Sequence, residues 1–153
     1  MSRRCVFLDR DGVINEKAPP HEYVRSWTDF RFLPNIVDWI RLFNVLGYLV
    51  IVISNQRGVA RGIMSAADVE DIHRRMTAEL ATQGAILNDI YYCPHEEGEC
   101  DCRKPRPGLV LQAREKWDID LAESLLIGDA DSDAELAMNC GVRFLRVEGG
   151  RIV

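Results

Sequence analysis

The sequence predicts an α/β protein: a Rossmann-like three-layer sandwich with a mainly parallel central sheet. Short apolar segments alternate along the chain with segments of helical periodicity, which is typical of parallel sheets covered by helices. Residues 49–53, Leu-Val-Ile-Val-Ile, are apolar and mostly β-branched, as a strand buried on both faces requires. The chain has 153 residues, so we expect a single domain over residues 1–153 with a core of its own.

The strands are expected where a short apolar run ends at polar or glycine residues. The runs that meet this description are residues 5–8, 49–53, 90–92, 124–127 and 143–147. Three of the strands lead directly to residues that carry chemistry, namely Asp9, Ser54 and Asp129. Because ligands bind beyond the carboxyl ends of parallel strands, we expect these side chains to converge on one edge of the sheet.

Helices are expected between the strands, at residues 34–46, 66–83, 109–117 and 134–140. Pro34 suits the first turn of a helix, and Gly47 suits a helix end. Ser65 is a good N-cap with Asp68 in the first turn, and apolar residues then recur at helical spacing as far as Gly84.

Charge and hydrophobicity exclude several classes of function. The 19 Lys and Arg residues against 24 Asp and Glu leave a net charge of −5, whereas a nucleic-acid-binding surface needs a basic face. No apolar run approaches the length of a membrane span, and the N-terminal apolar run is too short for a signal peptide. We therefore expect a cytoplasmic monomer that binds no nucleic acid and no membrane. A small anionic substrate is compatible with this charge.

Two carboxylates stand close together after the first strand, in Asp9-Arg-Asp11. In an extended chain, residues two positions apart point to the same side. Two like charges so close together are costly unless a cation neutralises them or one carboxylate is protonated. Mg²⁺ commonly binds one or two carboxylates together with substrate phosphate, and Asp129 could reach the same ion. A solvated turn with two surface aspartates is the alternative.

A second group of polar residues follows the most hydrophobic strand. Ser54, Asn55 and Gln56 offer a hydroxyl, amides and backbone N–H groups, all of which are donors suited to phosphate oxygens. Ordinary turn chemistry is the alternative interpretation of this segment. Arg57 comes next in the chain and is a candidate substrate contact.

Other polar residues are interpreted as structural. His73 stands beside Arg74 and Arg75, which indicates a solvated helix face. Asp131 is expected to cap the following helix or to hold its loop, whereas for Asp133 the choice between such a role and a contribution to the Mg²⁺ site stays open.

These segments together resemble the haloacid-dehalogenase-like (HAD) phosphatases over nearly the whole chain. The matching residues are Asp9-Arg-Asp-Gly-Val-Ile-Asn15, Ser54-Asn-Gln56, a Cys/His loop that ends in Arg103-Lys-Pro105, and Gly128-Asp129. The chain is similar in particular to the small subgroup without a separate cap domain, which hydrolyses heptose bisphosphates and histidinol phosphate. The resemblance therefore implies a HAD-like fold and a small phosphorylated metabolite as substrate.

The resemblance implies roles for the acidic residues. Asp9 would be the nucleophile that forms an aspartyl phosphate. Asp11 would protonate the leaving alkoxide and then deprotonate the water that hydrolyses the intermediate. Mg²⁺ would be held by Asp9, by the backbone carbonyl of Asp11 and by Asp129.

The resemblance also implies how the substrate is held. Ser54 and Lys104 would bind the phosphoryl oxygens, because phosphoryl transfer depends on positioning and charge stabilisation. Arg103 would contact the substrate beyond the phosphoryl group. The long loop 15–32 is rich in Pro, His and aromatic residues, and within it His21 and Tyr23 are candidate substrate contacts.

The Cys/His loop contains two ligand pairs, Cys93-x-His95 and Cys100-x-Cys102. Three thiolates and an imidazole would form a closed, structural zinc site. A Cys100–Cys102 disulfide would close a small strained ring, and a thioredoxin-like motif has two intervening residues rather than one. With the resemblance and a cytoplasmic setting, we expect Zn²⁺ in the loop 93–102.

The substrate signals divide between two members of the subgroup. Gly58-Val-Ala-Arg-Gly62 and Arg103-Lys-Pro-Arg-Pro-Gly108 look like heptose-1,7-bisphosphate 7-phosphatases, whereas only four residues separate His95 from Cys100, as in histidinol-phosphate phosphatases. Ala130 replaces a basic residue that is usual after Gly-Asp. The heptose bisphosphate is preferred, with histidinol phosphate or another sugar phosphate as the alternative. A phospho-receiver domain or a zinc-binding scaffold without activity is less favoured.

Overall fold

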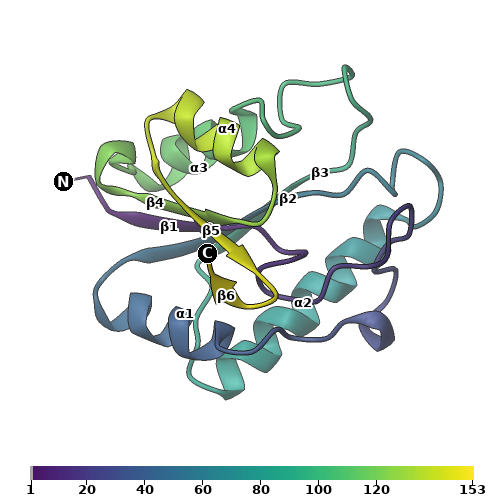
Figure 1. The fold of residues 1–153 in the computed structure, drawn as a ribbon, viewed down its shortest axis with the longest axis horizontal. Helices are drawn as coiled ribbons and strands as arrows, with labels where there is room; N and C mark the ends of the chain where they lie inside the picture. The colour runs from purple at the N-terminus through teal and green to yellow at the C-terminus, as the bar shows by residue number, and fades with distance from the viewer. Residues whose placement is uncertain (1) are drawn as a thin grey trace.

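The computed structural model describes residues 2–153, and its centre is a six-stranded sheet within that range (Figure 1). The strand order is β3-β2-β1-β4-β5-β6. The strands are β1 (Cys5–Leu8), β2 (Leu49–Asn55), β3 (Asp89–Cys93), β4 (Leu125–Gly128), β5 (Arg143–Glu148) and β6 (Arg151–Ile152). Strands β1 to β5 are parallel, and β6 runs antiparallel to β5. The mainly parallel sheet is thus confirmed.

Helices cover both faces of the sheet (Figure 1). The helices α1 (Ile36–Val45) and α2 (Ala66–Thr82) lie on one face, while α3 (Gly108–Trp117) and α4 (Asp131–Cys140) lie on the other. Two single turns of 3₁₀ helix, η1 (Trp27–Asp29) and η2 (Leu121–Glu123), lie in the connections. The three-layer α/β architecture is confirmed. No helix among residues 2–153 combines the length and apolar character needed to cross a bilayer.

The central strands are buried on both sides, as their continuous apolar runs predict. In β1, Val6 and Leu8 belong to the core formed with α1 and α2, whereas Cys5 and Phe7 belong to the core formed with α3 and α4. Side chains that alternate along a strand project to opposite faces, so β1 and β2 need apolar residues at every position. Both faces of β1 are consequently sealed from water up to the residue that precedes Asp9.

Helix boundaries agree with the sequence where a capping motif exists. Ser65 Oγ accepts a hydrogen bond from Asp68 N at 3.0 Å, and Asp68 Oδ2 accepts one from Ser65 N at 2.9 Å. This capping box satisfies two N–H groups that the helix leaves free and fixes the start of α2. The helix predicted at residues 34–46 instead begins at Ile36, because Asn35 has a left-handed backbone with φ of 76°.

The predicted convergence of polar residues follows from the strand register. Leu8 pairs with Val52 of β2 and with Ile127 of β4. The residues that follow these three positions therefore leave the sheet side by side at its carboxyl edge. Asp9, Ser54 and Asp129 are brought to the same end of the sheet.

Candidate active site

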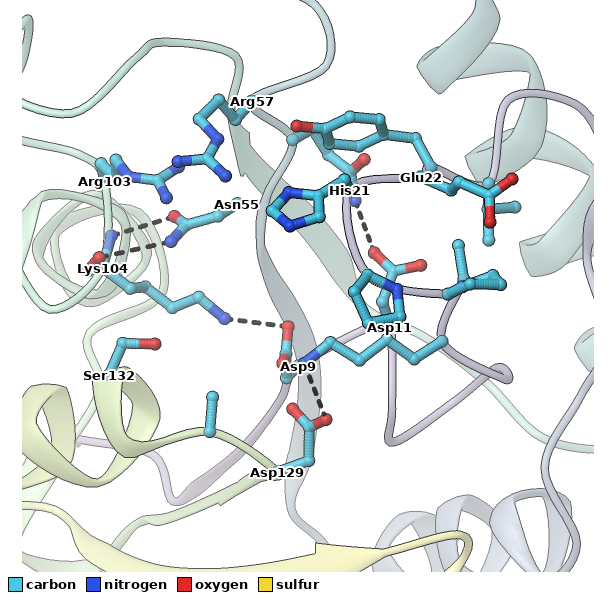
Figure 2. Close-up of a pocket in the computed structure, with 18 residues that line it drawn as sticks. Asp9, Asp11, His21, Glu22, Asn55, Arg57, Arg103, Lys104, Asp129 and Ser132 are labelled. Carbon is cyan, nitrogen blue, oxygen red and sulfur yellow. Dashed lines mark hydrogen bonds and ion pairs between the residues drawn. The ribbon is translucent and has the colours of Figure 1, made fainter.

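A cavity of about 320 Å³ lies at this carboxyl edge (Figure 2). Its walls come from the loops that follow β1, β2, β3 and β4. It brings together most of the residues predicted for the site, namely Asp9, Asp11, His21, Tyr23, Asn55, Gln56, Arg57, Arg103, Lys104 and Asp129.

Lys104 is the buried cation of the cavity (Figure 2). Its Nζ donates to Asp9 Oδ1 at 2.8 Å, to Asp133 Oδ1 at 2.8 Å and to the Ile53 carbonyl at 3.2 Å. Burial opposes the charge of Lys104, yet the two carboxylates raise the pKa of its ammonium group above the usual range. Lys104 therefore stays charged and points at Asp9.

The carboxylates around Lys104 fit a divalent cation. Oxygen atoms of Asp9, Asp129 and Asp133 lie within 4.8 Å of one another. Burial raises the pKa of Asp9 well above its usual range; Lys104 opposes this rise, and the two neighbouring carboxylates add to it. Asp129 Oδ1 is buried and has no hydrogen-bond partner among residues 2–153. An ion here would satisfy that oxygen and offset the repulsion between the carboxylates.

Gly12 allows Asp129 to reach this position. A Cβ atom on Gly12 would lie 2.1 Å from Asp129 Oδ2, and Gly12 has a φ of +91°. Gly12→Ala is expected to displace the Asp129 carboxylate and to lower kcat by about 100-fold, since displacements near 1 Å cost that much. Turnover with saturating Mg²⁺ is the measurement.

Gly47→Ala is the matched control for this prediction. Gly47 has a similar φ of +86° but no atom within 4 Å of the position of a Cβ. Both variants should lose about 1–2 kcal/mol of unfolding free energy from backbone strain, whereas the activity loss should be confined to Gly12→Ala. Equal activity of the two variants would show that Asp129 does not need its observed position.

Asp11 is held by donors on both carboxylate oxygens. Oδ1 accepts from Arg10 Nη2 and from Asn15 Nδ2, each at 2.9 Å, and Oδ2 accepts from Gln56 Nε2 at 2.9 Å. Burial alone would raise the pKa of Asp11, but the Arg10 guanidinium and the amides hold it below its usual range. Gln56 also donates to Ser54 Oγ at 2.8 Å. The Ser54 hydroxyl is buried under Gln56 instead of lining the cavity.

Asn55 lines the cavity but its side chain is bound to the backbone of Lys104. Asn55 Oδ1 accepts from Lys104 N at 2.9 Å, and Asn55 Nδ2 donates to Lys104 O at 3.3 Å. This pair of hydrogen bonds ties the loop after β2 to the loop that carries the lysine. Asn55 thus positions Lys104, besides whatever contact it makes with a substrate.

Two guanidinium groups lie on the same wall of the cavity, beside Asn55 (Figure 2). Arg57 Nε and Arg103 Nη1 are both buried without a hydrogen-bond partner in the described part of the chain. Glu96 lies 3.5 Å from Arg57 Nη1 and 2.8 Å from Arg61 Nε. Unpaired buried N–H groups are costly, so this wall suits an anionic ligand.

His73 corrects the sequence interpretation. It was expected on a solvated helix face, but its residue is only 6% exposed. Its Nε2 lies 3.1 Å from Nη1 of Arg10, which is completely buried. Arg10 is the one residue that could have indicated a buried His73, because a cation inside a buried turn needs hydrogen-bond acceptors around it.

The four predicted metal ligands form a compact cluster. Atoms of Cys93, His95, Cys100 and Cys102 lie within 4.8 Å of one another, and the sulfur–sulfur distances are 2.9, 3.3 and 3.4 Å. These distances exceed a disulfide bond, and the cysteines of the described chain are free. The cluster could hold a metal ion.

Known proteins with similar sequences are phosphatases. Residues 101–152 match a family model described as HAD-hydrolase-like. The chain is 44% identical over 155 residues to the D-glycero-beta-D-manno-heptose-1,7-bisphosphate 7-phosphatase of Rhodopseudomonas palustris, covering 96% of this chain and 84% of that protein. The chain belongs to the HAD-like phosphatases. The Escherichia coli K12 phosphatase of the same name is 39% identical to it over 151 residues, covering 92% of this chain and 78% of that one.

Solved structures of HAD-like phosphatases share the fold. The D,D-heptose 1,7-bisphosphate phosphatase from B. bronchiseptica, complexed with magnesium and phosphate, aligns with a TM-score of 0.86 and 32% identity. That alignment covers 92% of this chain and 78% of the other. A solved structure with the same fold as this HAD-like phosphatase therefore contains magnesium.

Several residues of this HAD-like phosphatase site received no definite site role from the sequence. The role of Asp133 was left open between helix cap and Mg²⁺ site; its Oδ2 accepts from Ala130 N at 3.3 Å, while its Oδ1 binds Lys104. The helix expected at residues 134–140 begins earlier, at Asp131, and this turn carries Asp133 inward. Arg10, His73 and Asn15 are further examples, since they contact Asp11 directly or through Arg10. Asp131 is exposed and pairs with Arg146.

Proposed function

We propose that this phosphatase removes the 7-phosphate of D-glycero-D-manno-heptose 1,7-bisphosphate. The proposal rests on the set of charged residues that line one cavity. Asp9 Oδ1 and Lys104 Nζ, 2.8 Å apart, belong to residues that line it, and Arg57 and Arg103 line it as well, each with one buried N–H that has no partner among residues 2–153. A substrate with two phosphates offers one to each group.

Asp9 is proposed to attack the phosphorus atom in line with the ester oxygen. A bond forms between a carboxylate oxygen and phosphorus while the ester P–O bond breaks, which leaves an aspartyl phosphate and an alcohol. Lys104 holds the phosphoryl oxygens through the charge that its two carboxylate partners maintain. The bond from Lys104 to Asp133 keeps the ammonium in place while the charge on Asp9 changes.

Asp11 is proposed to transfer the protons. It donates a proton to the departing oxygen and then takes one from the water that cleaves the aspartyl phosphate. Mg²⁺ would be held by Asp9, Asp129 and the Asp11 backbone carbonyl, and when bound it neutralises carboxylate and phosphoryl charge. The unpaired Asp129 Oδ1 supports this assignment.

Zn²⁺ is the proposed occupant of the Cys/His cluster. A sulfur about 2.3 Å and an imidazole nitrogen about 2.0 Å from a tetrahedral zinc ion lie about 3.5 Å apart, and His95 Nδ1 lies 3.5 Å from Cys93 Sγ and 3.3 Å from Cys102 Sγ. Four protein ligands leave no open position, which supports a structural role. The clip would hold the loop that leads to Arg103 and Lys104.

Phosphate release from a panel of substrates tests the proposed function. The panel contains both anomers of the heptose 1,7-bisphosphate, the heptose 7-phosphate and histidinol phosphate. The bisphosphate is expected to have a kcat/KM at least about 10-fold above the others, since a hydrogen bond between charged groups contributes about 1.5–3 kcal/mol. Both anomers are included because relatives named for the beta and the alpha form are 44% and 43% identical to the chain.

Two controls sharpen this test. Arg103→Met should raise the KM for the bisphosphate and leave the KM for the monophosphate nearly unchanged. The four-residue spacing between His95 and Cys100 favours histidinol phosphate as a second candidate. A higher kcat/KM for histidinol phosphate than for both bisphosphates would favour that candidate, and no release from any substrate with Mg²⁺ would contradict phosphatase activity.

A further inference from the structure

Arg10 is a fully buried cation beside the proposed proton-transfer group. It is 0% exposed, and its guanidinium has one partner on each terminal nitrogen: Asp11 Oδ1 at 2.9 Å and His73 Nε2 at 3.1 Å. Its Nε has no partner among residues 2–153. Burying a charge with so few partners is expensive, and neither the nucleophile nor the phosphoryl group is among them.

The contact with His73 defines the state of that histidine. A guanidinium only donates hydrogen bonds, so His73 Nε2 must be the acceptor and the ring must be the neutral tautomer protonated on Nδ1. Burial, together with the charge of Arg10, lowers the pKa of His73 to about 3. His73 also packs edge-on against Tyr92, with 5.6 Å between ring centroids. The histidine on α2 is therefore a fixed, neutral acceptor for Arg10.

The contact with Asp11 determines which of its oxygens can carry a proton. Oδ1 already accepts from two donors, Arg10 Nη2 and Asn15 Nδ2, whereas Oδ2 accepts from Gln56 Nε2. A proton on Oδ1 would have to displace a charged donor, which is the stronger kind of hydrogen bond. Oδ2 is left as the oxygen that exchanges protons.

We propose that Arg10 and His73 are positioning residues of proton transfer, because they hold Asp11 with Oδ2 toward the leaving oxygen. The inference rests on the proposed role of Asp11. The proton on Asp11 Oδ2 passes to the ester oxygen as the P–O bond breaks, and a proton of the attacking water returns to Oδ2. Arg10 and His73 exchange no proton in either step. Without the acceptor on α2, the guanidinium could swing from Asp11 toward other oxygens, and Asp11 would lose its orientation.

The leaving group distinguishes this role from a merely structural one. An alkoxide must be protonated as it leaves, whereas p-nitrophenolate leaves without help. His73→Leu is expected to lower kcat/KM for the heptose bisphosphate by roughly 10- to 100-fold, a part of the 10²–10⁴-fold that general acid catalysis supplies. Its kcat/KM for p-nitrophenyl phosphate should fall by less than about 3-fold, because kcat/KM covers the steps up to release of the leaving group and excludes the later hydrolysis of the aspartyl phosphate, in which Asp11 acts on both substrates.

Matched variants make the test specific. His73→Gln keeps a side-chain oxygen that can accept from Arg10 and should recover most of the activity on the bisphosphate. Tyr92→Leu removes packing around His73 but not the acceptor, so it should leave the ratio of the two activities unchanged. If His73→Leu does not fold, His73→Met fills the space with a flexible side chain and a weak acceptor, and the same selective loss is expected.

Two outcomes would overturn the inference, and they are distinguishable. Equal losses of kcat/KM on both substrates in His73→Leu, or no rescue by His73→Gln, contradict the positioning role while the proposed function stands. A wild-type protein that releases phosphate from neither substrate contradicts the proposed function, and with it the role of Asp11 on which the inference rests.

Discussion

Asp9→Asn is expected to lower turnover of the heptose bisphosphate on the order of 10⁴-fold or more, because loss of a covalent nucleophile costs at least that much in comparable enzymes. The amide has the shape of the carboxylate but cannot form the acyl phosphate. Lys104 keeps its 2.8 Å bond to Asp133, so the lysine stays in place. Steady-state phosphate release is the measurement, with trapping of the phosphorylated protein as a second one.

The stability of the Asp9→Asn variant separates chemistry from folding. Asp9 is buried next to Asp129 and Asp133, and their charges raise its pKa together with burial. Removing one of these carboxylates from the metal-free protein is therefore not expected to lower the free energy of unfolding. Asp131→Asn is the control: this aspartate is exposed and makes a surface ion pair with Arg146, so turnover should be unchanged. Full turnover of Asp9→Asn would contradict the nucleophile assignment.

The sequence carries most of the information about the fold. The apolar run 49–53 predicts a strand buried on both faces, and β2 is such a strand. The Ser65 and Asp68 pair predicts the start of α2. The start predicted at Pro34 was less accurate, because Asn35 has a left-handed backbone and the helix begins only at Ile36. The strand β6 has two exposed residues, and so short a segment has no hydrophobic period to detect.

The candidate site was predictable where its residues follow strands. Asp9 and Asp129 come directly after β1 and β4, so their proximity follows from the parallel order of the strands. Asp133 and His73 lie inside helices, where only the direction of the side chain decides whether it reaches the site. Asn55 has the expected place, but its bonds to the backbone of Lys104 depend on two loops meeting. These contacts are tertiary, and local sequence patterns do not report them.

Cys100→Ser is expected to lower both the stability and the activity of the protein. The segment from Pro94 to Pro107 contains no strand or helix within the described chain, so the proposed zinc ion is its main internal cross-link. Losing one of four ligands should cost several kcal/mol of unfolding free energy, because binding energy at a structural zinc site is folding energy. Wild-type protein should contain about one zinc per chain, the count that one closed site holds.

The activity loss of Cys100→Ser should arise through Lys104. This lysine follows Cys102 by two positions in the chain, and a misplaced cation loses its contact with the phosphoryl oxygens. Asn55 and Asp133 still bind Lys104, so kcat should fall by about 100-fold rather than vanish. Cys140→Ser is the matched control, because Cys140 is a free thiol outside the cluster, and it should keep its zinc and its kcat.

Chelation provides the same test without a mutation. A zinc-selective chelator, with Mg²⁺ in excess, should lower kcat of the wild-type protein to the level of Cys100→Ser and should not lower it further in that variant. Unchanged kcat after loss of zinc would show that the Cys/His cluster does not position Lys104. The loop packs tightly against the start of α3. A Cβ atom on Gly108 would lie only 2.5 Å from the Asp101 carbonyl oxygen. The displacement caused by losing the metal should therefore spread along the loop toward Lys104.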